Sequence, residues 1–263
     1  MTSKIDLKLS RRALGGMMVA GLAARPLSAL AALGSPGDYT ASSHLQTRVR
    51  GMKDSFIADP RTPGIRPLGL DKRRDAVLFV PPGMDFSKPA PLIVALHGAQ
   101  GAAFDGLKWF KAAATASKFL VVAPPSRGES WTVDAGPVGA DEAFIDLTLD
   151  WVCSRFPIDP LHLAVAGFSD GGTYALSTGM QNGDFFSDII AFSPLNVVAP
   201  NAIGKPRIFM AGGRADQMVS LATVERMKNQ LQGLGYDVMF DIHPKSHEVT
   251  DQSVKAAVTR FLS

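Results

Sequence analysis

Short apolar runs alternate with longer amphipathic segments along residues 76–262. The runs have the length and composition of buried strands, and the longer segments repeat their apolar positions at helical spacing. We expect strands at 76–80, 91–97, 120–123, 161–166, 188–192, 207–211 and 236–243, and helices at 107–119, 141–156, 173–180, 221–234 and 250–262. Because strands and helices take turns, the pattern predicts an α/β fold with a doubly wound, mostly parallel sheet in a single domain, residues 74–263.

Residues 33–73 break this pattern. They are rich in Gly, Pro, Ser and charge, and Pro60, Pro63 and Pro67 are too closely spaced for a helix of any length. We expect an irregular N-terminal segment, in which residues 65–70 could pair as a strand with the chain that follows.

Residues 1–32 predict a twin-arginine signal peptide. Ser-Arg-Arg at 10–12 precedes a stretch of small and apolar residues, and Ala-Leu-Ala at 29–31 offers a cleavage site. A membrane anchor is the alternative, but Arg25 and Pro26 interrupt the apolar stretch. We therefore expect a periplasmic or secreted protein, with the twin-arginine export machinery as a partner and no permanent membrane span.

The composition is that of a chain that buries a full core, since 46% of its 263 residues are hydrophobic and 19% are charged. The net charge is +3, but residues 1–32 hold five Lys or Arg and one Asp, so the remainder is near −1. This balance does not favour nucleic acid as a partner. The single cysteine, Cys153, excludes an intramolecular disulfide, and its apolar neighbours indicate a buried structural thiol.

Gly-Phe-Ser-Asp-Gly at 167–171 fits the pattern Gly-x-Ser-x-Gly between an expected strand and an expected helix. The turn in this pattern is sharp and strained, so the serine needs small neighbours. The turn would present the hydroxyl of Ser169 at a helix N-terminus, where free N–H groups stabilise negative charge. A glycine-rich turn that holds a serine by chance is the alternative, and the residues after the later strands favour the first interpretation.

Two later strands end beside residues that could activate this serine. Asp216 follows the strand at 207–211 and His247 follows the strand at 236–243, so both should lie at the same sheet edge as Ser169. The imidazole would take the serine proton, and the carboxylate would hold the imidazole in the required tautomer.

Other residues could fill these roles. His243 is within reach by sequence, but as the end of a strand it should be fixed in the sheet, which favours His247 as the base. Asp237 and Asp241 lie in the same expected strand and should be solvated. Two further histidines have no neighbouring motif that would give them a catalytic partner: His44 and His162.

The loop after the strand at 91–97 is a candidate for half of an oxyanion hole. It contains His-Gly-Ala-Gln-Gly at 97–101. We expect the backbone N–H groups of Ala99 and Asp170 to hold the oxyanion, with Gln100 as the second choice for the first donor. His97 itself would brace the loop and would not act as a base.

Together these motifs resemble the phospholipase/carboxylesterase group of the α/β-hydrolase superfamily, near the polyhydroxybutyrate depolymerases and feruloyl esterases. The resemblance covers about residues 74–263 and includes the order Ser169, Asp216, His247. It implies a carboxylesterase that hydrolyses carboxylic esters or thioesters of small molecules through an acyl-enzyme, with neither a metal nor an organic cofactor. The chain departs from the group at Gln100, where a glycine is frequent, and at Lys-Ser 245–246, where small glycines are frequent.

Two other functions share the pattern. A serine peptidase of the prolyl-oligopeptidase type has the same order of residues, although this chain lacks the length for its added propeller. A catalytically inactive hydrolase fold would serve as a binding protein, although all three residues are present.

The short connection between the strands at 188–192 and 207–211 leaves little room for a large lid. Aromatic residues could line the cleft or belong to the core: Trp109, Phe110 and Trp131.

The export assignment predicts that replacing Arg11 and Arg12 by Lys leaves the precursor in the cytoplasm. Fractionation of cells that produce the wild type and the double variant measures this. Mature protein in the periplasm at normal yield from the variant would contradict the assignment.

Overall fold

The computed structural model describes residue 45, residues 59–132 and residues 139–263. The expected signal peptide (1–32), most of the expected irregular segment (33–73) and His44 lie outside the described residues. Within the described part of the chain, no helix combines the length and apolar character that crossing a membrane requires.

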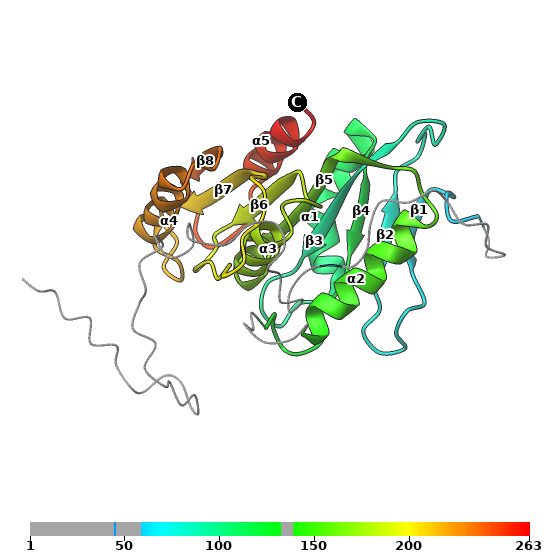
Figure 1. The fold of residues 1–263 in the computed structure, drawn as a ribbon, viewed down its shortest axis with the longest axis horizontal. Helices are drawn as coiled ribbons and strands as arrows, with labels where there is room; N and C mark the ends of the chain where they lie inside the picture. Colours follow the sequence, from blue (N-terminus) through cyan, green and yellow to red (C-terminus); the bar gives the residue numbers. More distant parts are fainter. Residues whose placement is uncertain (1–44, 46–58, 133–138) are drawn as a thin grey trace, which may run out of the picture.

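The strands are β1 (Gly64–Pro67), β2 (Val77–Val80), β3 (Ala90–Leu96), β4 (Leu120–Ala123), β5 (Ile158–Phe168), β6 (Asp188–Phe192), β7 (Arg207–Gly213) and β8 (Val238–His243). They form one sheet in the order β1-β2-β4-β3-β5-β6-β7-β8 (Figure 1). The strands from β4 to β8 pair in parallel, and β1 and β2 continue the sheet antiparallel at one edge. The doubly wound, mostly parallel sheet predicted from the sequence is confirmed.

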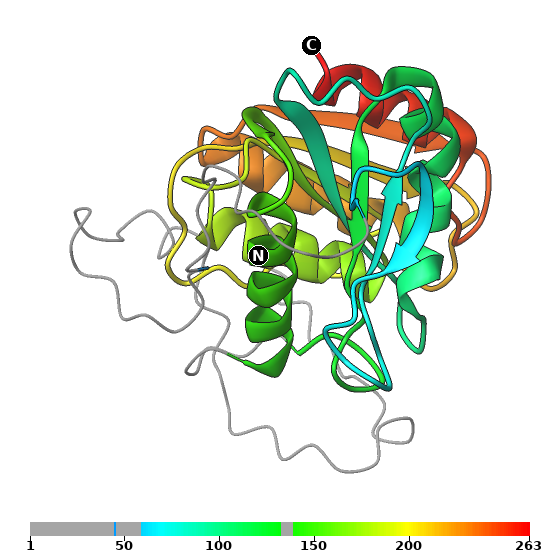
Figure 2. The same cartoon turned by 90° about the vertical axis from the view of Figure 1, so that its right-hand side faces the viewer.

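The helices of the described chain lie in two layers. They are α1 (Ala103–Ser117), α2 (Ala140–Cys153), α3 (Asp170–Gln181), α4 (Leu221–Gly233) and α5 (Asp251–Phe261). One core cluster joins α2, α3 and α4 to one face of the sheet, and a second joins α1 and α5 to the other face. Figure 2 shows the two layers on opposite sides of the strands. Because both faces are covered, the central strands are buried throughout, which explains their continuous apolar runs.

The element boundaries differ from the expected ones by a few residues at helix and strand ends. Helix α1 begins at Ala103, four residues before the expected start, because the Asp105 carboxylate accepts the N–H of Ala102 and stabilises an extra turn. Phe104 in that turn is 51% exposed, so the apolar pattern does not reveal it. Strands β4 and β6 match the expected bounds residue for residue, and Cys153 is buried as expected.

The connection from β6 to β7, residues 193–206, contains no helix and only an isolated bridge between Gly204 and Gly183. It packs against α3 through two hydroxyl groups. Thr173 Oγ accepts the N–H of Leu195 at 2.9 Å, and Ser177 Oγ accepts the N–H of Val198 at 3.0 Å. The domain therefore carries no large lid at this position, as the sequence predicts.

Helix α3 approaches the end of β3 so closely that only glycine fits at its second residue. A Cβ built on Gly171 would lie 2.7 Å from the carbonyl oxygen of Leu96 and still closer to that of His97. Both obstacles are backbone atoms, which cannot swing aside. The helix and the central strand are thus fixed against each other where β5 ends.

Gly171→Ala should lower the free energy of unfolding by about 2 to 3 kcal/mol, because the added methyl group forces the helix away from β3. Gly233→Ala is the matched control. Gly233 is also a helical glycine, and a Cβ there meets nothing within 4 Å, so its substitution should be neutral or stabilise by less than about 1 kcal/mol. Denaturant unfolding of both variants measures the difference, and equal stabilities would contradict the proposed clash.

Candidate active site

Ser169 lies on a strained turn between β5 and α3. Its backbone has φ 56° and ψ −119°, a conformation that residues with a Cβ rarely adopt. The turn is held from both sides, because the N–H of Ser169 donates to the carbonyl of Phe192 at 2.9 Å and its own carbonyl accepts the N–H of Thr173 at 2.9 Å. The serine side chain is therefore fixed at the carboxyl edge of the sheet, at the start of a helix.

The structure brings Ser169, His247 and Asp216 into one hydrogen-bonded row. His247 Nε2 lies 2.9 Å from Ser169 Oγ, and His247 Nδ1 lies 2.7 Å from Asp216 Oδ2. These contacts assign the proton of the neutral imidazole to Nδ1, so that Nε2 accepts from the serine hydroxyl. The three residues predicted from the order of motifs thus meet in the geometry that a serine nucleophile requires.

The carboxylate of Asp216 is held by the backbone as well as by the imidazole. Its Oδ1 accepts the N–H groups of Met218 at 2.9 Å and Val219 at 2.8 Å. Burial by itself would raise the pKa of Asp216, but the hydrogen bonds from Val219 and His247 outweigh it and hold the pKa below its usual value. Asp216 is consequently ionised near neutral pH.

The loops that carry Asp216 and His247 pack directly on each other. The N–H of Ala215 donates to the carbonyl of Lys245 at 3.2 Å. A Cβ on Gly213 would collide with the carbonyl oxygens of Lys245 and Ser246. The loop that carries His247 is thus closely packed although Lys245 and Ser246 replace the small residues frequent in the resembled group.

The loop after β3 lies against the turn of Ser169. A Cβ on Gly98 would lie 3.3 Å from the ring of Phe168 and 3.6 Å from its carbonyl oxygen. In the described part of the chain, the N–H groups of Ala99 and Asp170 have no hydrogen-bond partner, whereas the N–H of Gln100 donates to the carbonyl of Glu129 at 2.7 Å. Ala99 and Asp170 thus remain available as donors, and the second choice, Gln100, is occupied.

Gln100 has a left-handed backbone with φ 59°. Glycine reaches this conformation without steric cost, whereas a residue with a Cβ adopts it less readily.

His97 is fully buried and braces this loop through both ring nitrogens. Its Nδ1 lies 2.6 Å from the carbonyl oxygen of Gly98, and its Nε2 accepts the N–H of Ser126 at 3.0 Å. Burial lowers the pKa of His97, and the positive charge of Arg74 lowers it further. The ring is therefore neutral near pH 7, and the expectation that His97 is a brace agrees with its contacts.

The aromatic residues near the site have different surroundings. Phe110 is fully buried in the core, and Trp131 is buried and packs its ring against His97 at 4.9 Å between centroids. Trp109 meets the edge of Phe168 at 5.5 Å, and Phe168 in turn lies 4.6 Å from the imidazole of His247. The core interpretation is correct for Phe110, while Trp109 contacts Phe168, the ring that lies against His247.

The alternative acids and bases lie elsewhere. His243 is buried in β8, and its backbone is paired with Gly213. His162 contacts Asp159 at 2.7 Å, away from the carboxyl edge. Asp237 pairs with Arg260, and Asp241 accepts from Ser253. Among the described residues, the only side chain hydrogen-bonded to Ser169 Oγ is His247, which in turn contacts Asp216.

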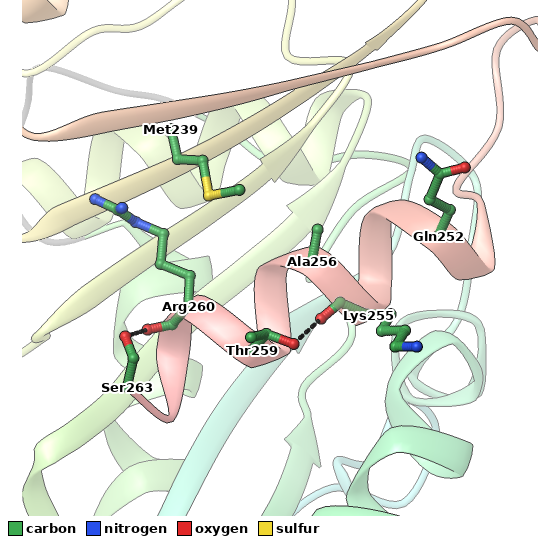
Figure 3. Close-up of a pocket in the computed structure, with 7 residues that line it drawn as sticks. All are labelled: Met239, Gln252, Lys255, Ala256, Thr259, Arg260 and Ser263. Atoms are coloured by element: carbon green, nitrogen blue, oxygen red, sulfur yellow. Dashed lines mark hydrogen bonds between the residues drawn. The ribbon is translucent and has the colours of Figure 1, made fainter.

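A groove of about 500 Å³ between α5 and the edge strand β8 lies apart from this row. Figure 3 shows its lining, which includes Met239, Ala256 and Arg260. The two hydroxyl groups of its lining donate to backbone carbonyls of α5, Thr259 Oγ1 to that of Lys255 and Ser263 Oγ to that of Arg260. None of the three residues of the row lines this groove.

Residues 126–132, between β4 and α2, form a segment that we call the strap. The sequence pattern assigned it no role, apart from Trp131. Ser126 and Trp131 both contact His97, Glu129 contacts Gln100, and Ser130 contacts Asp170. The one signal that could have identified it is its position, because it follows β4 at the same carboxyl edge of the sheet.

The fold and this row of residues define an α/β-hydrolase. The family model Esterase, described as "Putative esterase", matches residues 69–257, so the chain belongs to this esterase family and is a carboxylesterase-like hydrolase. A curated relative, acyl-protein thioesterase 1 of Neurospora crassa, is 30% identical over 120 residues, which are 42% of this chain and 48% of the relative. The chain therefore matches about half the length of that protein.

Solved structures share the fold at low identity. Esterase PE8 has a TM-score of 0.56 at 24% identity, over 70% of this chain and 97% of that one. The serine hydrolase FphF of Staphylococcus aureus has a TM-score of 0.60 at 18% identity, over 72% and 92%. A ferulic acid esterase of the fungus Anaeromyces mucronatus has a TM-score of 0.56 at 17% identity, over 72% and 83%.

Because His97 is buried and its pKa is lowered, we predict that part of the free energy of unfolding depends on pH. The unfolded chain takes up a proton at His97 below about pH 6.5, whereas the folded protein does so only at lower pH, because its pKa is lowered. The contribution of His97 to the free energy of unfolding is thus fully present above about pH 6.5. It is lost as the pH falls further, by up to about 1.4 kcal/mol per pH unit.

In His97→Asn this contribution disappears, while the other histidines still titrate. The fall in unfolding free energy between pH 7.5 and pH 5 should therefore be smaller in the variant than in the wild type. Denaturant unfolding at the two pH values measures it. An equal fall in both proteins would mean that His97 is not protected from protonation.

Proposed function

We propose that this chain hydrolyses carboxylic esters by nucleophilic catalysis, with Ser169 as nucleophile, His247 as general base and acid, and Asp216 as the carboxylate that orients His247. The observation that carries the proposal is the continuous row of hydrogen bonds from Ser169 Oγ through the imidazole to Asp216, at 2.9 and 2.7 Å. The esterase family match supports the same chemistry.

In the first step, His247 Nε2 takes the proton from Ser169 Oγ as that oxygen attacks the carbonyl carbon of the ester. The imidazole becomes positively charged, and the ionised Asp216 stabilises this charge through Nδ1–H. When the tetrahedral intermediate collapses, His247 gives the proton to the leaving alcohol, and the acyl group stays on Ser169. A water molecule, deprotonated by His247, then releases the acid.

The negative charge on the tetrahedral oxygen needs donors that are already in place. The N–H groups of Ala99 and Asp170 support this role, because they come from the two segments that meet at Gly98 and Phe168 and have no partner in the described chain. The first turn of α3 adds its helix dipole at the same place. Each such donor typically contributes about 100-fold to 1000-fold to turnover.

Thioesters are a second substrate class for the same residues, since a thiol leaves more readily than an alcohol once the tetrahedral intermediate has formed. The relation to acyl-protein thioesterase 1 supports testing them, and small esters are the first choice because residues 193–206 provide no large lid. The substrate panel should comprise p-nitrophenyl esters, acyl thioesters and aminoacyl amides. Preferential cleavage of the amides would instead favour a serine peptidase.

Ser169→Ala should reduce ester turnover by at least about 1000-fold while the unfolding midpoint stays near that of the wild type, because one oxygen is lost and no packing changes. Labelling with a fluorophosphonate probe should disappear in the same variant. A wild-type protein that is neither labelled nor active would identify the chain as an inactive hydrolase fold.

Variants of the two other residues extend this test. His247→Ala should cost about as much as Ser169→Ala, and Asp216→Asn should be severe but less complete, because triad members act as a unit. His243→Ala is the control, since that histidine is the last residue of β8, in the segment that leads to His247, and takes no part in the row of hydrogen bonds. An inactive His243→Ala with an active His247→Ala would overturn the assignment of the base.

A further inference from the structure

The strap, residues 126–132, joins the two segments that carry the proposed oxyanion donors. On the side of the β3 loop, the N–H of Ser126 donates to His97 Nε2 at 3.0 Å and Trp131 Nε1 donates to the carbonyl of His97 at 2.7 Å. The carbonyl of Glu129 accepts the N–H of Gln100 at 2.7 Å. These contacts bracket Ala99, the first donor, from both sides of the loop.

On the other side, the strap reaches the residue that supplies the second donor. Ser130 Oγ donates to Asp170 Oδ2 at 2.5 Å, the short distance expected of a hydroxyl bound to a carboxylate. Asp170 is the first residue of α3, and its side chain and N–H belong to the same strained turn as Ser169. A hydrogen bond at this side chain therefore constrains the direction of the N–H as well.

The strap is itself held rigidly. The buried carboxylate of Asp141, in the first turn of α2, accepts the N–H groups of Arg127 at 2.6 Å and Thr132 at 2.9 Å, close to the two ends of the strap. The ring of Trp131 lies between those of His97 and Tyr174, with centroid distances of 4.9 and 5.1 Å. A support built in this way can fix a neighbouring turn.

External support is needed because the two donors come from separate segments. The loop side is strained at Gln100, with φ 59°, and the nucleophile side is strained at Ser169, with φ 56°. Neither segment alone defines the separation of the N–H groups of Ala99 and Asp170. A change of about 1 Å in the position of a catalytic group can cost a factor of about 100 in rate.

We propose that Ser130 is a positioning residue for the oxyanion hole, and that its hydrogen bond to Asp170 fixes the second donor relative to the first. The inference rests on the proposed function, because it assumes that Ala99 and Asp170 bind the oxyanion. Ser130 touches neither the substrate nor the nucleophile in this role. It acts through Asp170, and the strap carries the constraint to His97 and Gln100.

The test compares Ser130→Ala with the wild type on the best ester of the panel. Loss of the hydroxyl frees the Asp170 side chain, so kcat should fall about 10-fold to 100-fold, while KM stays within about twofold. The affinity for a boronic acid inhibitor, whose tetrahedral adduct with Ser169 places an oxygen in the hole, should fall by a similar factor. The unfolding midpoint should stay near that of the wild type.

Three further variants make the result specific. Ser130→Thr retains a hydroxyl and should restore most of kcat. Ser130→Cys keeps nearly the same side-chain volume but is a weaker donor, so its kcat should fall as in Ser130→Ala. The cysteine variant therefore tests the hydrogen bond even if the alanine variant folds poorly. Ser87→Ala is the matched control. Ser87 Oγ also donates to an aspartate, Asp85 at 2.6 Å, but it lies in the exposed turn before β3, so kcat should be unchanged.

The outcomes separate the two proposals. If the wild type is active, Ser169→Ala is inactive, and Ser130→Ala and Ser130→Cys keep wild-type kcat and inhibitor affinity, the positioning role is wrong and the proposed function stands. A loss in Ser130→Ala that matches only its loss of folded protein, or that Ser130→Thr fails to restore, also overturns the role. If ester turnover does not depend on Ser169, the proposed function itself fails.

Discussion

The close approach of α3 to the end of β3 is the constraint on which the rest of the structure depends. Gly171 faces the carbonyl oxygens of Leu96 and His97, and a Cβ on Gly167 would overlap the backbone of Gly171. Within this space the chain turns from β5 into α3 at Ser169, whose backbone has a left-handed φ of 56°. The strain is maintained because the flanking strand and helix are both buried and cannot shift.

This turn determines where all other components of the site must lie. Asp216 and His247 follow β7 and β8 at the same carboxyl edge, and Gly213 lets their two loops come into backbone contact. Hydrogen bonds from Val219, His247 and Met218 hold the pKa of this carboxyl below its usual value although burial alone would raise it. In the proposed mechanism, this carboxylate stabilises the positive charge that develops on His247.

Two buried polar side chains hold the segments around the proposed oxyanion hole. His97 shapes the loop after β3 through both ring nitrogens, and the carboxylate of Asp141 accepts two backbone N–H groups of the strap. A buried polar side chain without such partners would be costly, so these hydrogen bonds indicate that the conformation of the strap is fixed. Through Trp131 the strap is hydrogen-bonded to His97, at the end of β3, and through Ser130 to Asp170, at the start of α3.

The sequence by itself determined the class of the fold, with a doubly wound and mostly parallel sheet, and the order of the motifs along the chain. Continuous apolar runs mark strands buried on both faces, and a parallel sheet brings the residues after each strand to one edge, so Ser169, Asp216 and His247 could be grouped without coordinates. The same reasoning placed Ala99 and Asp170 at that edge. Each of these inferences uses only local pattern and chain order.

Only the tertiary structure decided what depends on contacts between distant segments. It brought His247 into hydrogen-bond contact with Ser169, it showed that the N–H of Gln100 donates to the carbonyl of Glu129, and it placed Phe110 in the core. The hydrogen bond of Ser130 to Asp170 joins residues 40 positions apart in the chain. No periodicity marks such a contact, because a loop takes its conformation from the side chains against which it packs, and these come from elsewhere in the sequence.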